Sequence, residues 1–101
     1  MALSTKIFFE NYCDEPLYIF LRTVNGTLEI HVFDEPIPMA APVPPMRRID
    51  FAVTDQIRAC INNGSLSYML VGHNRRLHVA FSPGRNRLPE GPIFAIEPVK
   101  A

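Results

Sequence analysis

The chain has 101 residues, of which 48% are hydrophobic and 20% are charged, and its formal net charge is zero. This length suits one domain with one core, and the composition excludes an intrinsically disordered chain. Zero net charge excludes a general electrostatic attraction to nucleic acid or to an anionic membrane.

The compartment is predicted from the cysteines and from the start of the chain. Two cysteines are too few for a disulfide scaffold, so we expect free thiols in a reducing compartment. The first residues lack the basic flank and long apolar run of a secretory signal, and no stretch is long enough to span a bilayer. Because the sequence begins with methionine, we expect a complete cytoplasmic chain.

The first half of the chain alternates apolar and polar residues with a period of two, which predicts β-strands. The first strand is expected at residues 6–12. The next two, residues 17–24 and 27–33, flank Asn25-Gly26, whose residues tolerate the positive φ angles of a tight hairpin turn. Five prolines fall within residues 34–46, so this segment is predicted to be an extended crossover between sheets and not a central strand.

The second half continues the same pattern. Strands are expected at residues 47–53, 56–61, 65–71, 76–81 and 92–99. In the second of these, Ile57, Ala59 and Ile61 would face the core, and Asn62-Asn63-Gly64 would form another hairpin turn. Short strands separated by regular turns predict an all-β fold, an antiparallel β-sandwich of about seven to eight strands that fills residues 1–101 as one domain.

Candidate catalytic and metal-binding residues are few. An enzyme would need Cys60 beside His73 or His78, and no nucleophile motif accompanies them. Cys60 is expected on the outward side of its strand. His31 and His78 are also expected to point outward, at a spacing that matches no compact metal motif. We therefore predict no catalytic residue, no metal site and no cofactor; a small hydrolase or metal protein built on these residues is the remaining enzymatic alternative.

Bulky apolar residues also occur on the outward phase of the expected strands, where a solvated sheet face should be polar. They are Phe8, Tyr18, Phe20, Phe33, Met69 and Val71. Two interpretations are open. In the first, the strands are covered on both sides, or the inward and outward residues of some strands are exchanged. In the second, these residues form an exposed patch for dimerisation or partner docking. The second interpretation predicts a non-catalytic protein-interaction module that self-associates as a homodimer. Its contact residues would be Phe8, Tyr18, Phe20, Phe33 and Met69.

Clustered arginines give a second candidate function, the binding of an anionic ligand or nucleic acid. The residues concerned are Arg47, Arg48, Arg75 and Arg76. Arginine suits bidentate pairing with phosphate or carboxylate groups. The two pairs open different strands and need not form one patch, and aromatic residues that would stack on bases are scarce beside them. We therefore rank this function below protein binding and expect no nucleic-acid partner.

Four short segments occur in the same order as in the β-domain of the von Hippel-Lindau tumour suppressor. They are Ile7-Phe8-Phe9-Glu10-Asn11, Asn25-Gly26, Pro44-Pro45-Met46-Arg47-Arg48-Ile49 and Gly91-Pro92-Ile93-Phe94-Ala95. The chain resembles that domain, and the resemblance implies a sandwich of seven or eight strands and peptide binding at an exposed edge. It does not imply hydroxyproline recognition, because Phe51, Asp55 and Ile57 stand where that family has Ser, His and Trp. The chain has no Trp, and it lacks the helical region through which that family joins a ubiquitin ligase.

Overall fold

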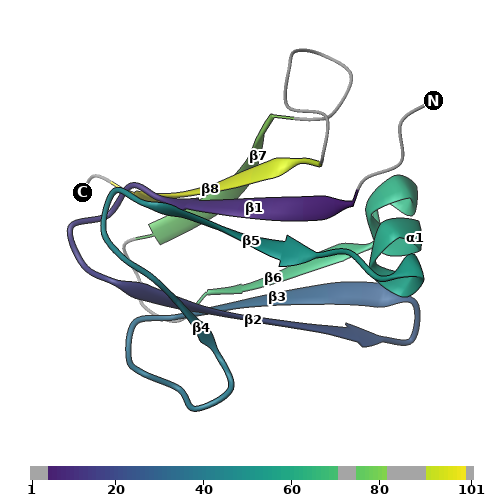
Figure 1. The fold of residues 1–101 in the computed structure, drawn as a ribbon, viewed down its shortest axis with the longest axis horizontal. Helices are drawn as coiled ribbons and strands as arrows, with labels where there is room; N and C mark the ends of the chain where they lie inside the picture. The colour runs from purple at the N-terminus through teal and green to yellow at the C-terminus, as the bar shows by residue number, and fades with distance from the viewer. Residues whose placement is uncertain (1–4, 71–74, 82–90, 100–101) are drawn as a thin grey trace.

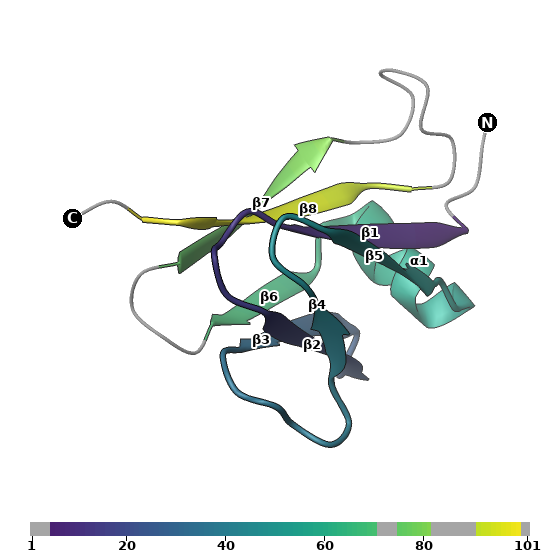
Figure 2. The ribbon, with the colours of Figure 1, turned by 60° about the vertical axis from the view of Figure 1, so that its left-hand side comes forward.

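The computed structural model describes residues 5–70, 75–81 and 91–99. In these residues the chain forms two four-stranded sheets and one short helix (Figure 1). The elements are β1 (Lys6–Asn11), β2 (Leu17–Val24), β3 (Thr27–Phe33), β4 (Ala41–Val43), β5 (Arg48–Ala52), α1 (Asp55–Asn63), β6 (Leu66–Leu70), β7 (Arg75–Phe81) and β8 (Ile93–Pro98). The two sheets form separate layers (Figure 2), which confirms the predicted all-β sandwich.

One sheet has the strand order β5-β1-β8-β7 and is called the β1 sheet below; the other has the order β4-β2-β3-β6 and is called the β2 sheet. Among the described strands, four pairings are antiparallel, whereas β1 pairs with β8 and β3 pairs with β6 in parallel. The sheets are therefore mixed, although the sequence predicted antiparallel pairing throughout. Both parallel partners are distant in sequence and need a crossover connection, which a strand pattern does not reveal.

The β2–β3 hairpin has the predicted bounds and turn. Asn25 and Gly26 adopt φ angles of 51° and 77°, as a two-residue hairpin turn with two left-handed residues requires. The turn fixes the register, in which Val24 is opposite Thr27 and Tyr18 is opposite Phe33. This register decides which side chains share the outer face of the β2 sheet.

The proline-rich crossover between the sheets contains one short strand, β4, that the sequence did not predict. It pairs only with β2 and lies at the edge of the β2 sheet, with Pro42 exposed. An edge position tolerates proline because the missing N–H would face away from the sheet. This confirms the prediction that the segment is not a central strand.

The prediction of a strand at residues 56–61 is wrong, because this segment belongs to the helix α1. The Thr54 hydroxyl caps its first turn by accepting a hydrogen bond from the Ile57 N–H at 3.2 Å. At the other end Gly64 is left-handed, with φ of 71°, and its N–H points to the last helical carbonyls. Asn62-Asn63-Gly64 is thus the end of a helix and not a hairpin turn.

The helix closes one end of the sandwich, next to the β2–β3 hairpin (Figure 1). Ile57 and Ile61, one turn apart, pack against the core, whereas Ala59, expected inward, is exposed. Cys60, expected outward, is buried, and its thiol donates to the Gly26 carbonyl at 3.3 Å. Ile57 and Ile61 therefore follow the helical period of 3.6 residues and not the strand period of two.

The core between the sheets consists of the inward residues of both layers. Phe9 and Phe94 stack with ring centroids 5.2 Å apart, and Phe51 meets Phe9 edge-on at 5.6 Å. From the β2 sheet, Ile19, Ile30 and Val32 are almost completely buried. With these positions inward, the intervening residues of β2 and β3 point away from the core.

Candidate functional site

The outer face of the β2 sheet gathers four of the five residues predicted to bind a partner. Tyr18 is opposite Phe33, while Phe20, His31 and Met69 are aligned across β2, β3 and β6. Tyr18, His31 and Phe33 alternate with buried core residues of their strands, and Phe20 and Met69 are each paired with His31, so all five share the outward side. We call these residues, Tyr18, Phe20, His31, Phe33 and Met69, the aromatic face.

The side chains of the aromatic face contact one another and remain partly open to solvent. Met69 is 39% exposed, and Tyr18, Phe20 and Phe33 are half-buried. The His31 ring stacks on Phe33 with centroids 6.0 Å apart and lies 5.7 Å from Phe20. The rings therefore pack laterally on the sheet surface, and their outer sides are not sealed by the rest of the described chain.

A hollow of about 390 Å³ lies between the aromatic face and the loop from β3 to β4. Its walls are formed by Phe20, Arg22, His31, Phe33, Ile37, Pro38 and Met39. Met39 is 76% exposed at this hollow. Sequence reasoning assigned the loop to a crossover and missed this part of the site; the available signal was the two large apolar residues, Ile37 and Met39, among the prolines.

A small charged cluster borders the aromatic face. Glu29 Oε1 lies 2.6 Å from Arg22 Nε and 3.1 Å from His31 Nε2. The Arg22 hydrogen bond, followed by that of His31, holds the pKa of the Glu29 carboxyl below its usual value. Arg22 and the ionised Glu29 carry opposite charges and compensate each other.

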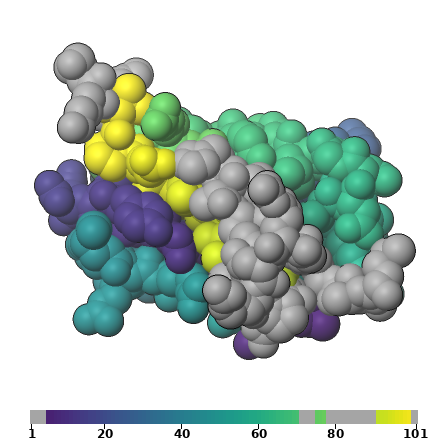
Figure 3. Space-filling view, turned by 90° about the horizontal axis from the view of Figure 1, so that it is seen from above, coloured from purple at the N-terminus to yellow at the C-terminus, as the bar shows by residue number. Residues whose placement is uncertain are grey.

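Phe8, the fifth predicted contact residue, does not belong to this surface. It lies on the outer side of the β1 sheet, opposite Ile93, and is only 6% exposed. The Arg48 guanidinium lies over its ring, 5.1 Å from the centroid. Figure 3 views the molecule from the side of this sheet, where β1 and β8 run next to each other. A second predicted apolar residue, Val71, falls outside the described residues.

The arginines of the anion-binding alternative do not converge. Arg48 is on β5 and Arg75 on β7, which are opposite edges of the β1 sheet. Arg48 lies 3.8 Å from a Glu10 carboxylate oxygen. The residue after Arg75, Arg76, is exposed to solvent. Arg47 is exposed just before β5. These four residues therefore form no single anion site.

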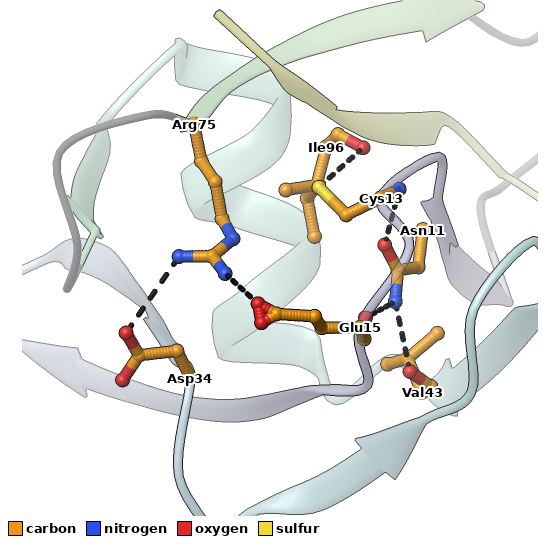
Figure 4. A network of polar contacts seen from close by, with 7 residues as sticks. All are labelled: Asn11, Cys13, Glu15, Asp34, Val43, Arg75 and Ile96. Atoms are coloured by element: carbon orange, nitrogen blue, oxygen red, sulfur yellow. Dashed lines mark hydrogen bonds and ion pairs between the residues drawn. The ribbon is translucent and has the colours of Figure 1, made fainter.

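Arg75, the first residue of β7, has a structural role through its contacts with Glu15 and Asp34 (Figure 4). Its guanidinium lies 3.7 Å from the carboxylates of Glu15 and Asp34, and its side chain is only 12% exposed. Asp34 directly follows β3, and Glu15 belongs to the loop between β1 and β2. The charge of Arg75 thus ties the β1 sheet to the β2 sheet and is already compensated.

Asn11 completes the same end of the molecule (Figure 4). Its buried amide donates to the Glu15 carbonyl at 2.8 Å and the Val43 carbonyl at 3.0 Å, and its oxygen accepts from the Cys13 N–H at 2.8 Å. Burial raises the pKa of the Cys13 thiol, which disfavours the reactive thiolate. The bonds of Asn11 therefore satisfy its buried amide and join the loop after β1 to β4.

Of the enzymatic candidates Cys60, His73 and His78, the structure describes the side chain of Cys60 alone. Cys60 lines a second hollow, of about 330 Å³, between α1 and the β2–β3 hairpin, whose lining residues include no histidine and no acid. Within residues 5–70, 75–81 and 91–99, no three His, Cys, Asp or Glu side chains gather as metal ligands. His73 and the His78 side chain lie outside the described part of the molecule.

Comparisons with protein-family models, with curated proteins and with solved structures found no match to this chain. In the described part of the chain, no helix is long and apolar enough to cross a membrane. The candidate functional surface is the aromatic face together with the hollow beside it.

Proposed function

We propose that this chain is a non-catalytic protein-interaction module that binds a second copy of itself through the aromatic face. One observation carries the proposal: Tyr18, Phe20, Phe33 and Met69 come from three strands and gather on one outward sheet surface. The outward side of a solvated sheet is normally polar. A contiguous apolar patch on such a side is therefore often an interaction site.

The composition of the face also favours a protein partner. Aromatic residues and methionine are enriched in the centres of protein interfaces, where charged residues are depleted. Here the charged residues Arg22 and Glu29 are paired with each other at 2.6 Å and lie beside the rings. An interface on this face can therefore bury the rings without leaving an uncompensated charge.

A small-molecule site is less well supported. Ligand pockets usually hold roughly 300 to 1,000 Å³ and enclose most of their ligand. The hollow of about 390 Å³ lies at the lower end of this range and is bordered by solvent-exposed side chains such as Met39. A surface hollow of this kind suits a side chain of another protein better than an enclosed ligand.

Sedimentation velocity of the full chain over roughly 10 μM to 1 mM tests this proposal, since these concentrations bracket micromolar to near-millimolar dissociation constants. We expect the wild type to shift from one chain toward two, and Phe20→Glu to remain a monomer because it places a charge in the interface. Ala52→Glu is the matched control, since Ala52 is exposed on β5 of the other sheet and should leave association unchanged. A wild type that stays monomeric at every concentration contradicts the proposal.

A further inference from the structure

We infer that the free edge of β6 binds an extended, uncharged peptide segment of another protein, which adds a strand to the four-stranded β2 sheet. This inference goes beyond the proposed function, because it concerns the edge of the sheet and not the aromatic face. It follows from three features of the described residues: unpaired main-chain groups on β6, the lack of any protection of its edge, and a core residue that stays open to solvent.

The pairing of β3 with β6 shows which main-chain groups of β6 are unpaired. In a parallel pair, alternate residues of a strand direct N–H and C=O toward the neighbour, and the residues between them point away. The Leu28 N–H donates to the Ser65 carbonyl at 2.9 Å. Continued along the register, this pattern bonds Ser67 and Met69 to β3, so the N–H and C=O of Tyr68 point to the free side. Within the described residues, no other hydrogen bond reaches these two groups.

The other outer strands of the two sheets are protected against strand addition. β4 is short and contains Pro42, which has no N–H to donate. β5 carries Arg48 and Asp50, both in ion pairs with β1, and β7 has an irregular register between Val79 and Phe81. Short length, proline, charge and irregularity are the usual means by which proteins block a sheet edge. β6 has no proline, no charged residue and no irregular register, so it can act as a template for another strand.

Tyr68 shows what an added strand would cover. It is opposite the buried Ile30, and its ring meets that of Phe94 edge-on at 6.4 Å, so it points toward the core. Tyr68 is nevertheless 40% exposed. The core is therefore open to solvent beside β6, and an apolar side chain of an added strand can pack against the ring.

The chemistry of the partner follows from this edge. Unpaired N–H and C=O groups along a strand are complementary to the main chain of an extended peptide, whose hydrogen bonds supply the affinity in strand addition. On the inward side the peptide meets Tyr68, and on the outward side it meets Met69, which is 39% exposed. We expect apolar or β-branched residues in the peptide and no charge at its centre, because no described residue of β6 would compensate it.

A second copy of the chain suits this edge less well. In the folded chain only Gly64 and Ser65 separate β6 from α1, and β6 also contacts β7. Another folded copy would have to bring these elements to the same edge, whereas an extended peptide has none to accommodate. The positions matched to the von Hippel-Lindau peptide pocket, Phe51, Asp55 and Ile57, lie on β5 and α1, so the β6 edge is a different site.

Amide hydrogen exchange of the full chain, measured by NMR, tests the free edge. We expect the Tyr68 N–H to exchange about tenfold faster or more than those of Ser67 and Met69, which are bonded to β3. A Tyr68 N–H that is equally protected, or that becomes protected as the protein concentration rises, contradicts the inference. In the first case the chain itself would fill the edge, and in the second case a second copy would.

A capped nonapeptide of alternating threonine and valine with a lysine at each end is the binding probe. At about 1 mM we expect it to shift the NMR peaks of β6 and to slow exchange of the Tyr68 N–H about fivefold. The matched control is the same peptide with its central amides N-methylated, which keeps the side chains and should bind at least about tenfold more weakly because its donors are lost. No binding, equal binding of the two peptides, or shifts confined to other strands would overturn the inference.

Two variants of the chain test the same donor. Tyr68→Pro removes the N–H on the free side and leaves the bonds to β3, since an edge strand tolerates proline there. Tyr68→Ala loses the ring but keeps this N–H, and we expect it to bind the probe about tenfold more tightly than Tyr68→Pro. Equal binding of the two folded variants contradicts the inference, and if Tyr68→Pro does not fold, the N-methylated peptide decides.

Discussion

The two outer faces of the sandwich carry similar apolar residues, but these residues differ in how deeply they are buried. On the β1 sheet, Phe8, Ile93 and Ala95 point outward and are buried. On the β2 sheet, Phe20, Phe33 and the other rings of the aromatic face point outward and stay partly exposed.

This difference shows that an apolar outward phase has two distinct meanings. On the β1 sheet the outward apolar residues add to the interior of the folded chain, whereas on the β2 sheet they remain available to another molecule. Burial in the folded monomer distinguishes the two cases, and alternation in the sequence does not. Substitutions should accordingly reduce stability on one face and association on the other.

The largest expected effect is the contrast between Phe8 and Phe20. Phe8→Ala removes a buried ring and should lower the free energy of unfolding by about 3 kcal/mol or more. Phe20→Ala removes a ring that is still partly exposed and should cost the monomer less, about 1 to 2 kcal/mol, since part of its area already contacts water. Urea unfolding at low protein concentration measures both. Equal losses at the two positions would contradict the distinction between a covered and an open face.

A second, smaller effect concerns the close approach of β8 to β1. A Cβ at Gly91 would collide with the backbone carbonyl of Lys6, so Gly91→Ala must displace the chain at the start of β8. We expect a loss of about 2 to 3 kcal/mol, typical of overpacking against a rigid neighbour. Gly64→Ala is the control: it meets no atom within 4 Å but has a positive φ of 71°, and should cost about 1 kcal/mol. A Gly91→Ala protein as stable as the wild type would show that the strands have room to separate.

The smallest effect is the pH dependence of the open face. The pKa of Glu29 in the folded chain lies below its usual value of 4.5, with Arg22 as the main cause. Its ion pair therefore contributes stability above about pH 4.5, and this contribution is lost as the pH falls through the lower folded pKa. Thermal unfolding should show the wild type more stable than Glu29→Gln at neutral pH, with the difference shrinking in acid. A difference that grows as the pH falls would reverse the sign of the argument.

Local signals in the sequence sufficed for part of the fold. Asn25-Gly26 fixed the β2–β3 hairpin, and with it the row of Tyr18 and Phe33 on one face. The helix α1 was missed because Ile57 and Ile61 fit both a strand and a helix, although Thr54 and Gly64 supply its two caps. A cap pattern at both ends outweighs alternation over so short a segment.

Contacts distant in sequence could not be predicted. Phe8 is buried next to Ile93 of β8 and beneath the Arg48 guanidinium, and the sequence around Phe8 does not predict either neighbour. The hollow at Met39 likewise forms only because the crossover loop returns to β2 and β3. The resemblance to the von Hippel-Lindau β-domain remains a prediction.

A dilution series followed by two-dimensional ¹H–¹⁵N NMR tests the central claim most directly, because it reports each backbone amide separately. The account predicts that peaks from β2, β3 and β6, and from the loop around Met39, shift or broaden as the concentration rises, while those of β1 and β5 stay in place. Spectra identical at all concentrations, or changes confined to the β1 sheet, would contradict it.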